Sequence, residues 1–156
     1  LLNTLTSSKV LAEKRLFATL DPSSRRLRFP RDTQVIVTDT VGFIKDLPED
    51  LKVAFRATLE ELESADILLH VIDIGNPRCM EQVRAVETIL TDLDLHRIPA
   101  IRVLNKQDLV STATLQKMVR SIGGIPISAK KKKTTLPLIE TLETMLTNKS
   151  RPSHKA

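Results

Sequence analysis

Residues 100–108 read Ala-Ile-Arg-Val-Leu-Asn-Lys-Gln-Asp, and the fold can be worked out from this segment. Its first half is a nearly continuous apolar run, which is typical of a strand buried on both faces of a parallel sheet. Similar runs occur at 34–39 and 67–73, with a shorter one at 125–127. Residues 25–29 instead alternate between Arg and apolar side chains, which predicts an edge strand with one face in water.

Helical patterns separate these runs. In four stretches, apolar side chains recur every three or four residues, which is the spacing of one helix face. The stripes are Leu51, Phe55, Leu59 and Leu62; Val83, Val86, Leu90 and Leu93; Leu115, Met118, Val119 and Ile122; and Ile139, Leu142 and Leu146. We expect them to pack in a core rather than to bind a cofactor. Alternating strands and helices predict a doubly wound α/β domain over 1–147, followed by a polar tail at 148–156.

The composition is that of an ordinary globular domain, with 41% hydrophobic and 28% charged residues among 156. No apolar run approaches the roughly 18 residues of a membrane span. The single cysteine, Cys79, excludes an internal disulfide and favours a reducing cytoplasm. The net charge of +5 is compatible with an RNA partner but is also common without one. Because only 3% of residues are aromatic, binding of single-stranded RNA by base stacking is not expected.

Polar motifs follow three of the predicted strands. They are Asp39-Thr40-Val41-Gly42, Asn105-Lys106-Gln107-Asp108 and Ser128-Ala129-Lys130. Ligands of open α/β sheets bind beyond the carboxyl ends of the strands, so these motifs are expected to line one edge of the sheet. The second motif is the most specific of the three. The other two are weak alone, but their order and spacing around it support the same interpretation.

The chemistry of the second motif favours guanine. The Asp108 carboxylate can accept hydrogen bonds from both N1 and N2 of guanine, and adenine offers no such pair of donors. The stem of Lys106 can lie over the base plane, and the Asn105 amide can connect this loop to its neighbours. The alternative is an ordinary turn between strand and helix in which Asp108 acts as a cap.

The remaining motifs are compatible with phosphate and Mg²⁺. Asp39 can hold a water on Mg²⁺, and the Gly42 amide can approach a γ-phosphate because glycine has no side chain in the way. Upstream, Phe17-Ala18-Thr19-Leu20-Asp21-Pro22 precedes the edge strand. A Thr hydroxyl there can bind Mg²⁺ and order its loop while the γ-phosphate is present, although the segment alone also fits any loop.

Taken together, these segments resemble the Obg–HflX group of translation-factor GTPases, and the HflX family most closely. The segments that carry the resemblance lie at 16–22, 39–44, 47–48, 54–61, 69–73 and 105–108. The resemblance implies a Ras-like G domain with the P-loop NTPase fold that binds GTP or GDP with Mg²⁺ and hydrolyses GTP. It also implies a cytoplasmic protein, expected to be monomeric, that binds the large ribosomal subunit during ribosome splitting or rescue.

The resemblance also implies roles for individual residues. The nucleotide-binding residues are Phe17, Ala18, Thr19, Leu20, Asp21, Asp39, Thr40, Val41, Gly42, Asn105, Lys106, Gln107, Asp108, Ser128, Ala129 and Lys130. Thr19 is expected to bind Mg²⁺ directly, and Asp39 through a water. Phe43 occupies the position where small GTPases often use Gln to orient the attacking water, so no catalytic residue is assigned. We therefore expect slow intrinsic hydrolysis that the ribosome accelerates.

The phosphate-binding loop of the family is not found in this sequence. None of the four glycines fits the pattern Gly-x-x-x-x-Gly-Lys-Ser/Thr. In the family, the segment 1–6 is the helix just after that loop, so the chain is expected to start past it and to lack the strand before it. That strand belongs between 34–39 and 67–73. We therefore expect weak nucleotide binding, no hydrolysis by this chain alone, and two apolar strand edges that are exposed or forced together.

Two other interpretations of the sequence stay open. The first is a catalytically inactive module that binds ribosomal RNA or protein through a degenerate G domain. The second is a phospho-acceptor receiver domain, in which Asp39 and Asp73 form part of an acidic cluster, but this leaves 105–108 unexplained. The lysine run 130–133 fits either an RNA contact or a solvated loop. His70 is expected to be a packed core residue.

Overall fold

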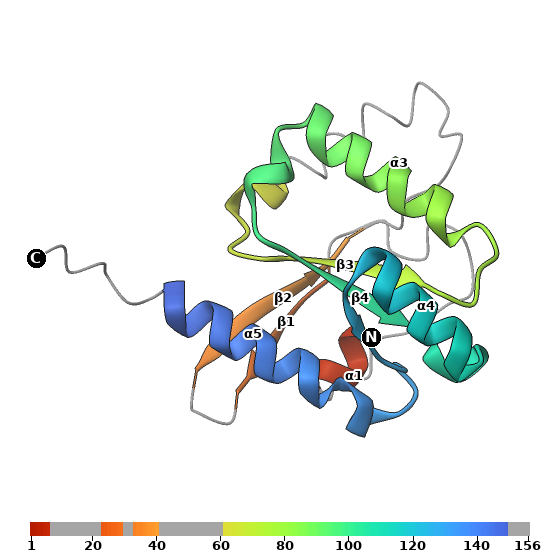
Figure 1. Ribbon diagram of the computed structural model, residues 1–156. Coiled ribbons are helices and arrows are strands. Elements are labelled where there is room, and N and C mark those ends of the chain that lie inside the picture. Colours follow the sequence, from red (N-terminus) through yellow and green to blue (C-terminus); the bar gives the residue numbers. More distant parts are fainter. Residues whose placement is uncertain (7–22, 30–32, 41–60, 150–156) are drawn as a thin grey trace, which may run out of the picture.

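The computed structural model describes residues 1–6, 23–29, 33–40 and 61–149 (Figure 1). The helices and strands are α1 (Leu2–Thr6), β1 (Ser23–Arg28), β2 (Gln34–Asp39), β3 (Leu68–Asp73), α3 (Cys79–Asp92), β4 (Ala100–Asn105), α4 (Thr112–Ile122), β5 (Ile125–Pro126) and α5 (Leu136–Lys149). Short 3₁₀ helices lie at Glu61–Ser64, Leu95–Arg97, Gln107–Leu109 and Lys132–Thr135. No helix in this part of the chain is long and apolar enough to cross a membrane.

The described strands form two sheets. β3, β4 and β5 pair in parallel in that order, and Asp73 at the end of β3 lies beside Asn105 at the end of β4. β1 and β2 form a separate antiparallel pair, as expected for an alternating edge strand next to an apolar one. The three parallel strands confirm the prediction of an α/β sheet with parallel pairing.

The prediction that the run at 34–39 is buried on both faces is wrong for the described structure. β2 is a strand, but its alternate residues are exposed, and Ile36 is 73% exposed. The cause is its position in a two-stranded sheet, where one face packs inward through Val35 and Val37 and the other has no covering layer in the described part of the chain. The apolar composition of a strand therefore does not by itself establish that both faces are covered.

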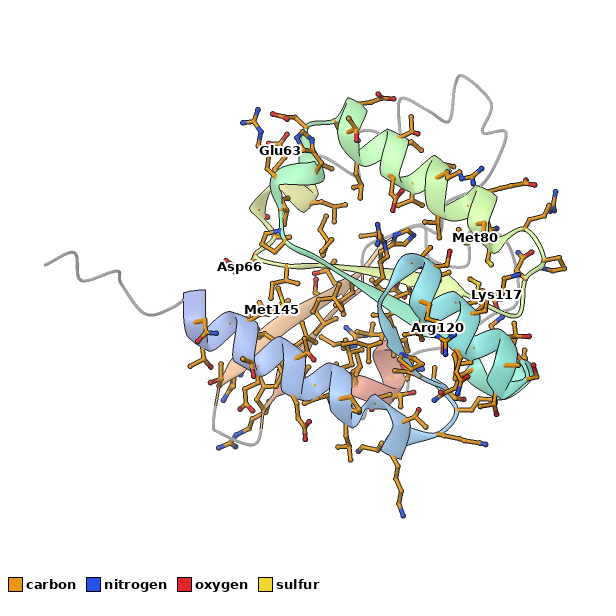
Figure 2. The ribbon with its side chains drawn as sticks, viewed as in Figure 1. Glu63, Asp66, Met80, Lys117, Arg120 and Met145 are labelled. Carbon is orange, nitrogen blue, oxygen red and sulfur yellow. The ribbon has the colours of Figure 1, made fainter. Side chains whose placement is uncertain are left out.

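Helices cover both faces of the parallel sheet, which confirms the doubly wound fold (Figure 1). On one face, the apolar side chains of β3 and β4 pack against α3 and α4 around Ile72 and Leu104. On the other, Val103 and Ile127 pack with α5, α1 and the β1–β2 pair. Figure 2 shows Met145 on the side of α5 that faces the strands, where it packs against this second cluster.

The predicted apolar stripes of α4 and α5 lie at these two interfaces. Of the predicted α3 stripe, Val83 packs in the first cluster and Val86 is also buried, while Leu90 and Leu93 belong to neither cluster. The stripe from Leu51 to Leu62 falls outside the described residues except for its last member, which lies in the 3₁₀ helix Glu61–Ser64. α5 continues to Lys149, two residues into the segment expected to be a tail.

A groove separates the two sheets. It has a volume of about 1800 Å³, and both β2 and β3 line it along their length, through Val35, Val37, Leu69 and Val71 among others. Each of these strands is paired along only one edge within the described residues. The division of the sheet falls where a further strand is expected from the sequence, and β2 and β3 do not pair with each other within the described residues.

The local sequence explains where α4 begins and ends and how closely β5 then approaches β4. The helix begins after Ser111, whose hydroxyl accepts a hydrogen bond from the backbone N–H of Thr114 at 3.2 Å. It ends at Gly123, which has φ of 67°, and Gly124 follows with φ of 102°. A Cβ on Gly124 would lie 2.6 Å from the carbonyl oxygen of Arg102, so only glycine fits this close approach of β5 to β4.

A charged cluster connects α3, β4 and α4. The Arg102 guanidinium donates to Glu87 Oε1 at 2.6 Å and to the carbonyl oxygen of Ile122 at 2.7 Å. His70 lies beside Arg102 in the register of β3 and β4. Burial lowers the pKa of His70; the Glu87 carboxylate opposes this effect, and the Arg102 charge adds to it. His70 is half-buried, so its prediction as a core residue is only partly correct.

Candidate functional site

The loop after β4 contains the predicted base-reading residues. Lys106 adopts the left-handed conformation, with φ of 66° and ψ of 33°, and a 3₁₀ helix follows at Gln107–Leu109. The turn is closed by a hydrogen bond from the Leu109 N–H to the Lys106 carbonyl at 2.9 Å. The Gln107 N–H donates to the carbonyl of Ile127 at 3.0 Å, which ties this loop to the end of β5. A non-glycine residue in the left-handed region is uncommon, and such residues concentrate at functional sites.

Asn105 connects this loop to the second predicted motif. Its side-chain Oδ1 accepts a hydrogen bond from the backbone N–H of Ala129 at 3.0 Å. The carbonyl of Ala129 accepts a hydrogen bond from the hydroxyl of Thr4, on α1, at 2.6 Å. The predicted role of the Asn105 amide as a connection between loops thus agrees with the geometry. The contribution of Thr4 was missed, because nothing in the sequence indicates that a residue 125 positions away reaches this loop.

Asp108 and Ser128 lie close together in these two loops. The hydroxyl of Ser128 is the largest cause that lowers the pKa of the Asp108 carboxyl, and the charges of Lys130 and Lys131 act in the same direction. Ser128 is fully buried, and its Oγ makes no hydrogen bond of acceptable geometry in the described structure. The hydroxyl therefore lies near the carboxylate without a close bond to it. Asp108 is exposed and charged, as a carboxylate that accepts hydrogen bonds from a ligand must be.

Thr134 holds the loop that carries Ser128. Its hydroxyl accepts a hydrogen bond from the backbone N–H of Ser128 at 2.8 Å and lies 2.7 Å from the carbonyl of Lys131, to which it donates. The Lys131 N–H donates to the carbonyl of Ser128 at 2.8 Å. The loop is therefore ordered by its own hydrogen bonds, while the side chains of Lys130–Lys133 stay exposed.

Asp73 is a second residue that the sequence analysis did not place in this site. Its Oδ2 forms an ion pair of 2.6 Å with Lys106 Nζ, and its Oδ1 accepts a hydrogen bond from the Gly75 N–H at 3.0 Å. Its position could have been inferred, because the carboxyl ends of neighbouring parallel strands lie side by side. Asp73 and Asn105 are register partners at the ends of β3 and β4.

Asp39 lies at the end of β2, where it lines the groove together with Thr40 and Asp73. Asp39 keeps contact with solvent, but partial burial of its carboxyl raises its pKa, and the N–H of Thr40 opposes this shift. The start of α1 lies close to Asp39, and both line the groove.

The other predicted residues of the phosphate and Mg²⁺ region lie outside the described residues. They are Phe17, Ala18, Thr19, Leu20, Asp21, Val41, Gly42 and Phe43. In the part that is described, no group of three or more His, Cys, Asp or Glu side chains is arranged to hold a metal ion. A Mg²⁺ ion that is bound mainly by nucleotide phosphates requires only one or two protein oxygens. The partly desolvated carboxylate of Asp39 suits this role.

Comparison with known proteins identifies the family. Residues 1–106 match the family model described as 50S ribosome-binding GTPase. The chain is 47% identical over 143 residues to GTPase HflX of Caldanaerobacter subterraneus subsp. tengcongensis, an alignment that covers 92% of this chain and 32% of that protein. The chain therefore spans about a third of the length of this curated relative.

Solved structures show the same fold. SsGBP variant G235S matches with a TM-score of 0.78 at 24% identity, over 99% of this chain and 52% of that one. Era, solved with MgGDPNP and a segment of 16S ribosomal RNA, matches with a TM-score of 0.65 at 25% identity, over 99% of this chain and 53% of that one. The receiver interpretation is thereby excluded. The chain belongs to the family of 50S ribosome-binding GTPases, and it is a G domain of the HflX type.

Proposed function

We propose that this domain binds GTP and GDP by reading the guanine base through Asp108, with Asn105, Lys106, Gln107, Ser128, Ala129 and Lys130 forming the rest of the base site. The observation that carries the proposal is the exposed, charged Asp108 carboxylate near the hydroxyl of Ser128, in two loops that the Asn105 side chain connects through Ala129. A buried polar group without a partner is costly. A guanine bound here would donate its N1–H and N2–H to the Asp108 carboxylate, so neither donor would be left without a partner.

The phosphates and Mg²⁺ belong at the other end of α1. We assign Thr19 as the direct Mg²⁺ ligand, Asp39 as a ligand through water, and Phe17 to Asp21 with Thr40, Val41 and Gly42 as the surrounding switch segments. Mg²⁺ neutralises charge that develops on the phosphates during hydrolysis. Asp39 contributes a carboxylate whose partial desolvation makes a nearby cation favourable.

GTP hydrolysis is proposed for the full-length protein and not for this chain alone. The sequence contains no Gly-x-x-x-x-Gly-Lys-Ser/Thr motif, whose lysine and amide groups would bind the β- and γ-phosphates. Phe43 follows Gly42 and carries no hydrogen-bonding group to orient water. We therefore propose slow intrinsic hydrolysis that is accelerated when the protein binds the large ribosomal subunit, as a monomeric cytoplasmic factor in ribosome splitting or rescue.

The guanine assignment is tested by the variant Asp108→Asn in the full-length gene product. An Asn amide presents one donor and one acceptor, which matches the N1–H and O2 of xanthine better than the two donors of guanine. Fluorescent GDP should lose affinity by at least about 10² fold, and a xanthosine diphosphate should gain affinity. Asp92→Asn, the same chemical change on the exposed end of α3, serves as the control and should bind GDP like the wild type. If Asp108→Asn bound GDP with the same affinity as the wild type, the assignment would be refuted.

The ribosomal part of the proposal needs its own measurement. Sedimentation with purified large subunits is expected to retain the full-length protein with a non-hydrolysable GTP analogue and to release it with GDP. The alternative function is a binding module with an inactive G domain. That alternative predicts the same retention with GTP analogue, with GDP and without nucleotide, and no stimulation of GTP hydrolysis by the subunits.

A further inference from the structure

Two strand ends meet beside the base-reading loop, and one of them has no role in the function proposed above. Asp73 ends β3, and its carboxylate contacts the Lys106 ammonium at 2.6 Å. We infer that Asp73 is a positioning residue for guanine-nucleotide binding. It holds the side chain of Lys106 in the conformation that places its aliphatic stem along the base. This inference rests on the proposed function, because it adds a residue to the same site.

The turn that follows β3 fixes the orientation of the Asp73 carboxylate. Oδ1 accepts the Gly75 N–H at 3.0 Å, and the carbonyl of Asp73 accepts the N–H of Asn76 at 3.1 Å, so the turn after β3 holds the side chain in place. This arrangement directs Oδ2 toward Lys106. A Cβ on Gly75 would lie 3.3 Å from both Asp73 Oδ1 and Leu109 Cδ1, so the turn also packs closely against the base-reading loop.

Both the backbone and the side chain of Lys106 are held by their surroundings. Lys106 has φ of 66°, a conformation that costs a residue with a Cβ free energy and is retained only where the surroundings impose it. A lysine side chain also has many rotamers, and each must be excluded before its stem can pack against a base. An ion pair with a fixed carboxylate restricts those rotamers in the absence of nucleotide, so less ordering remains to be done when guanine binds.

A purely structural role is the competing explanation, and the geometry separates the two. Asp73 and Lys106 are 36% and 49% exposed, so a pair of this kind adds little to the stability of the fold. Its effect should therefore be found in the rate at which nucleotide leaves rather than in the melting temperature. Asp73→Asn is a suitable change, because the amide oxygen can still accept the Gly75 N–H while the charge that faces Lys106 is lost.

The test is a double-mutant cycle on release of fluorescent GDP from the full-length gene product. Asp73→Asn should accelerate GDP release about three- to fivefold with Lys106 present. In the Lys106→Met background, which keeps an unbranched stem but no ammonium, the same change should have no further effect, because the two residues act as one unit. Asp92→Asn, which is remote from the site, should leave the rate unchanged.

The outcomes separate this inference from the proposed function. If the wild type binds GDP and Asp73→Asn leaves the release rate unchanged, the positioning role is refuted and the proposed function stands. An equal acceleration in both Lys106 backgrounds, accompanied by a lower melting temperature, would also refute it and would indicate a structural role. If the folded wild type binds no guanine nucleotide, the proposed function fails, and the inference fails with it.

Discussion

The connection between the two base-site loops can be tested in this chain without any nucleotide. Asn105→Ala removes the acceptor of the Ala129 N–H, a partly buried hydrogen bond of 3.0 Å. Such a bond contributes about 1 kcal/mol net, which corresponds to about a fivefold change in an equilibrium constant. Amide hydrogen exchange, measured residue by residue, should therefore show Ala129 exchanging at least about five times faster in this variant.

The design includes a matched variant and an internal reference. Asn105→Asp keeps an oxygen at the acceptor position, so the protection of Ala129 should be retained. The amide of Ile127, which donates to the carbonyl of Leu104 at 2.9 Å, reports whether the adjacent strands stay folded, and its exchange should not change. Unaltered exchange of Ala129 in Asn105→Ala, with Ile127 also unaltered, would show that the side chain does not hold the loop.

Three further predictions concern stability and nucleotide release. In thermal denaturation, Gly124→Ala should destabilise more than Gly123→Ala, by about 1 kcal/mol or more, because only the former places a Cβ 2.6 Å from a backbone oxygen. Because the pKa of His70 is lowered from 6.5, the unfolded chain binds this proton more readily, and the free energy of unfolding should fall as pH drops below 6.5; His70→Gln should reduce that slope in denaturant titrations. In the full-length protein, Thr4→Val should accelerate GDP release, while Thr6→Val, whose hydroxyl bonds within α1, should change it less.

The strands and the base-reading loop could be predicted because their signals are local. An apolar run such as 100–104 determines a buried strand through its own residues, and a motif directly after it must lie at the carboxyl end of that strand. The proximity of Asn105–Asp108 to Ser128–Ala129 follows in turn, because β4 and β5 are parallel neighbours. The burial of β2 could not be predicted in the same way, since it depends on which strands lie beside it and not on its own composition.

The contacts that hold the site are the part that the sequence does not reveal. Thr4 and Ala129 are 125 residues apart, and Asp73 and Lys106 are 33 apart, so neither pair leaves a spacing pattern. Asp73 ends the segment 69–73 and fits an acidic cluster, but the sequence shows only its position at a strand end and not the partner it faces. Thr134 has no distinguishing sequence feature at all, yet its hydroxyl bonds both Ser128 and Lys131.

The short helix α1 lies between Asp39 and the loop that carries Ala129. The start of α1 lies close to Asp39, and the hydroxyl of Thr4 donates to the carbonyl of Ala129. Three residues of helix span only about 4.5 Å along the axis, so a displacement at the start of α1 is expected to reach Thr4. A ligand that draws the start of α1 toward the Asp39 carboxylate would therefore also move the carbonyl contact that supports the base loop. If the phosphates bind beside Asp39 and the base at Asp108, as proposed, binding at the two ends is then expected to be cooperative, and Thr4 is the residue through which that coupling would pass.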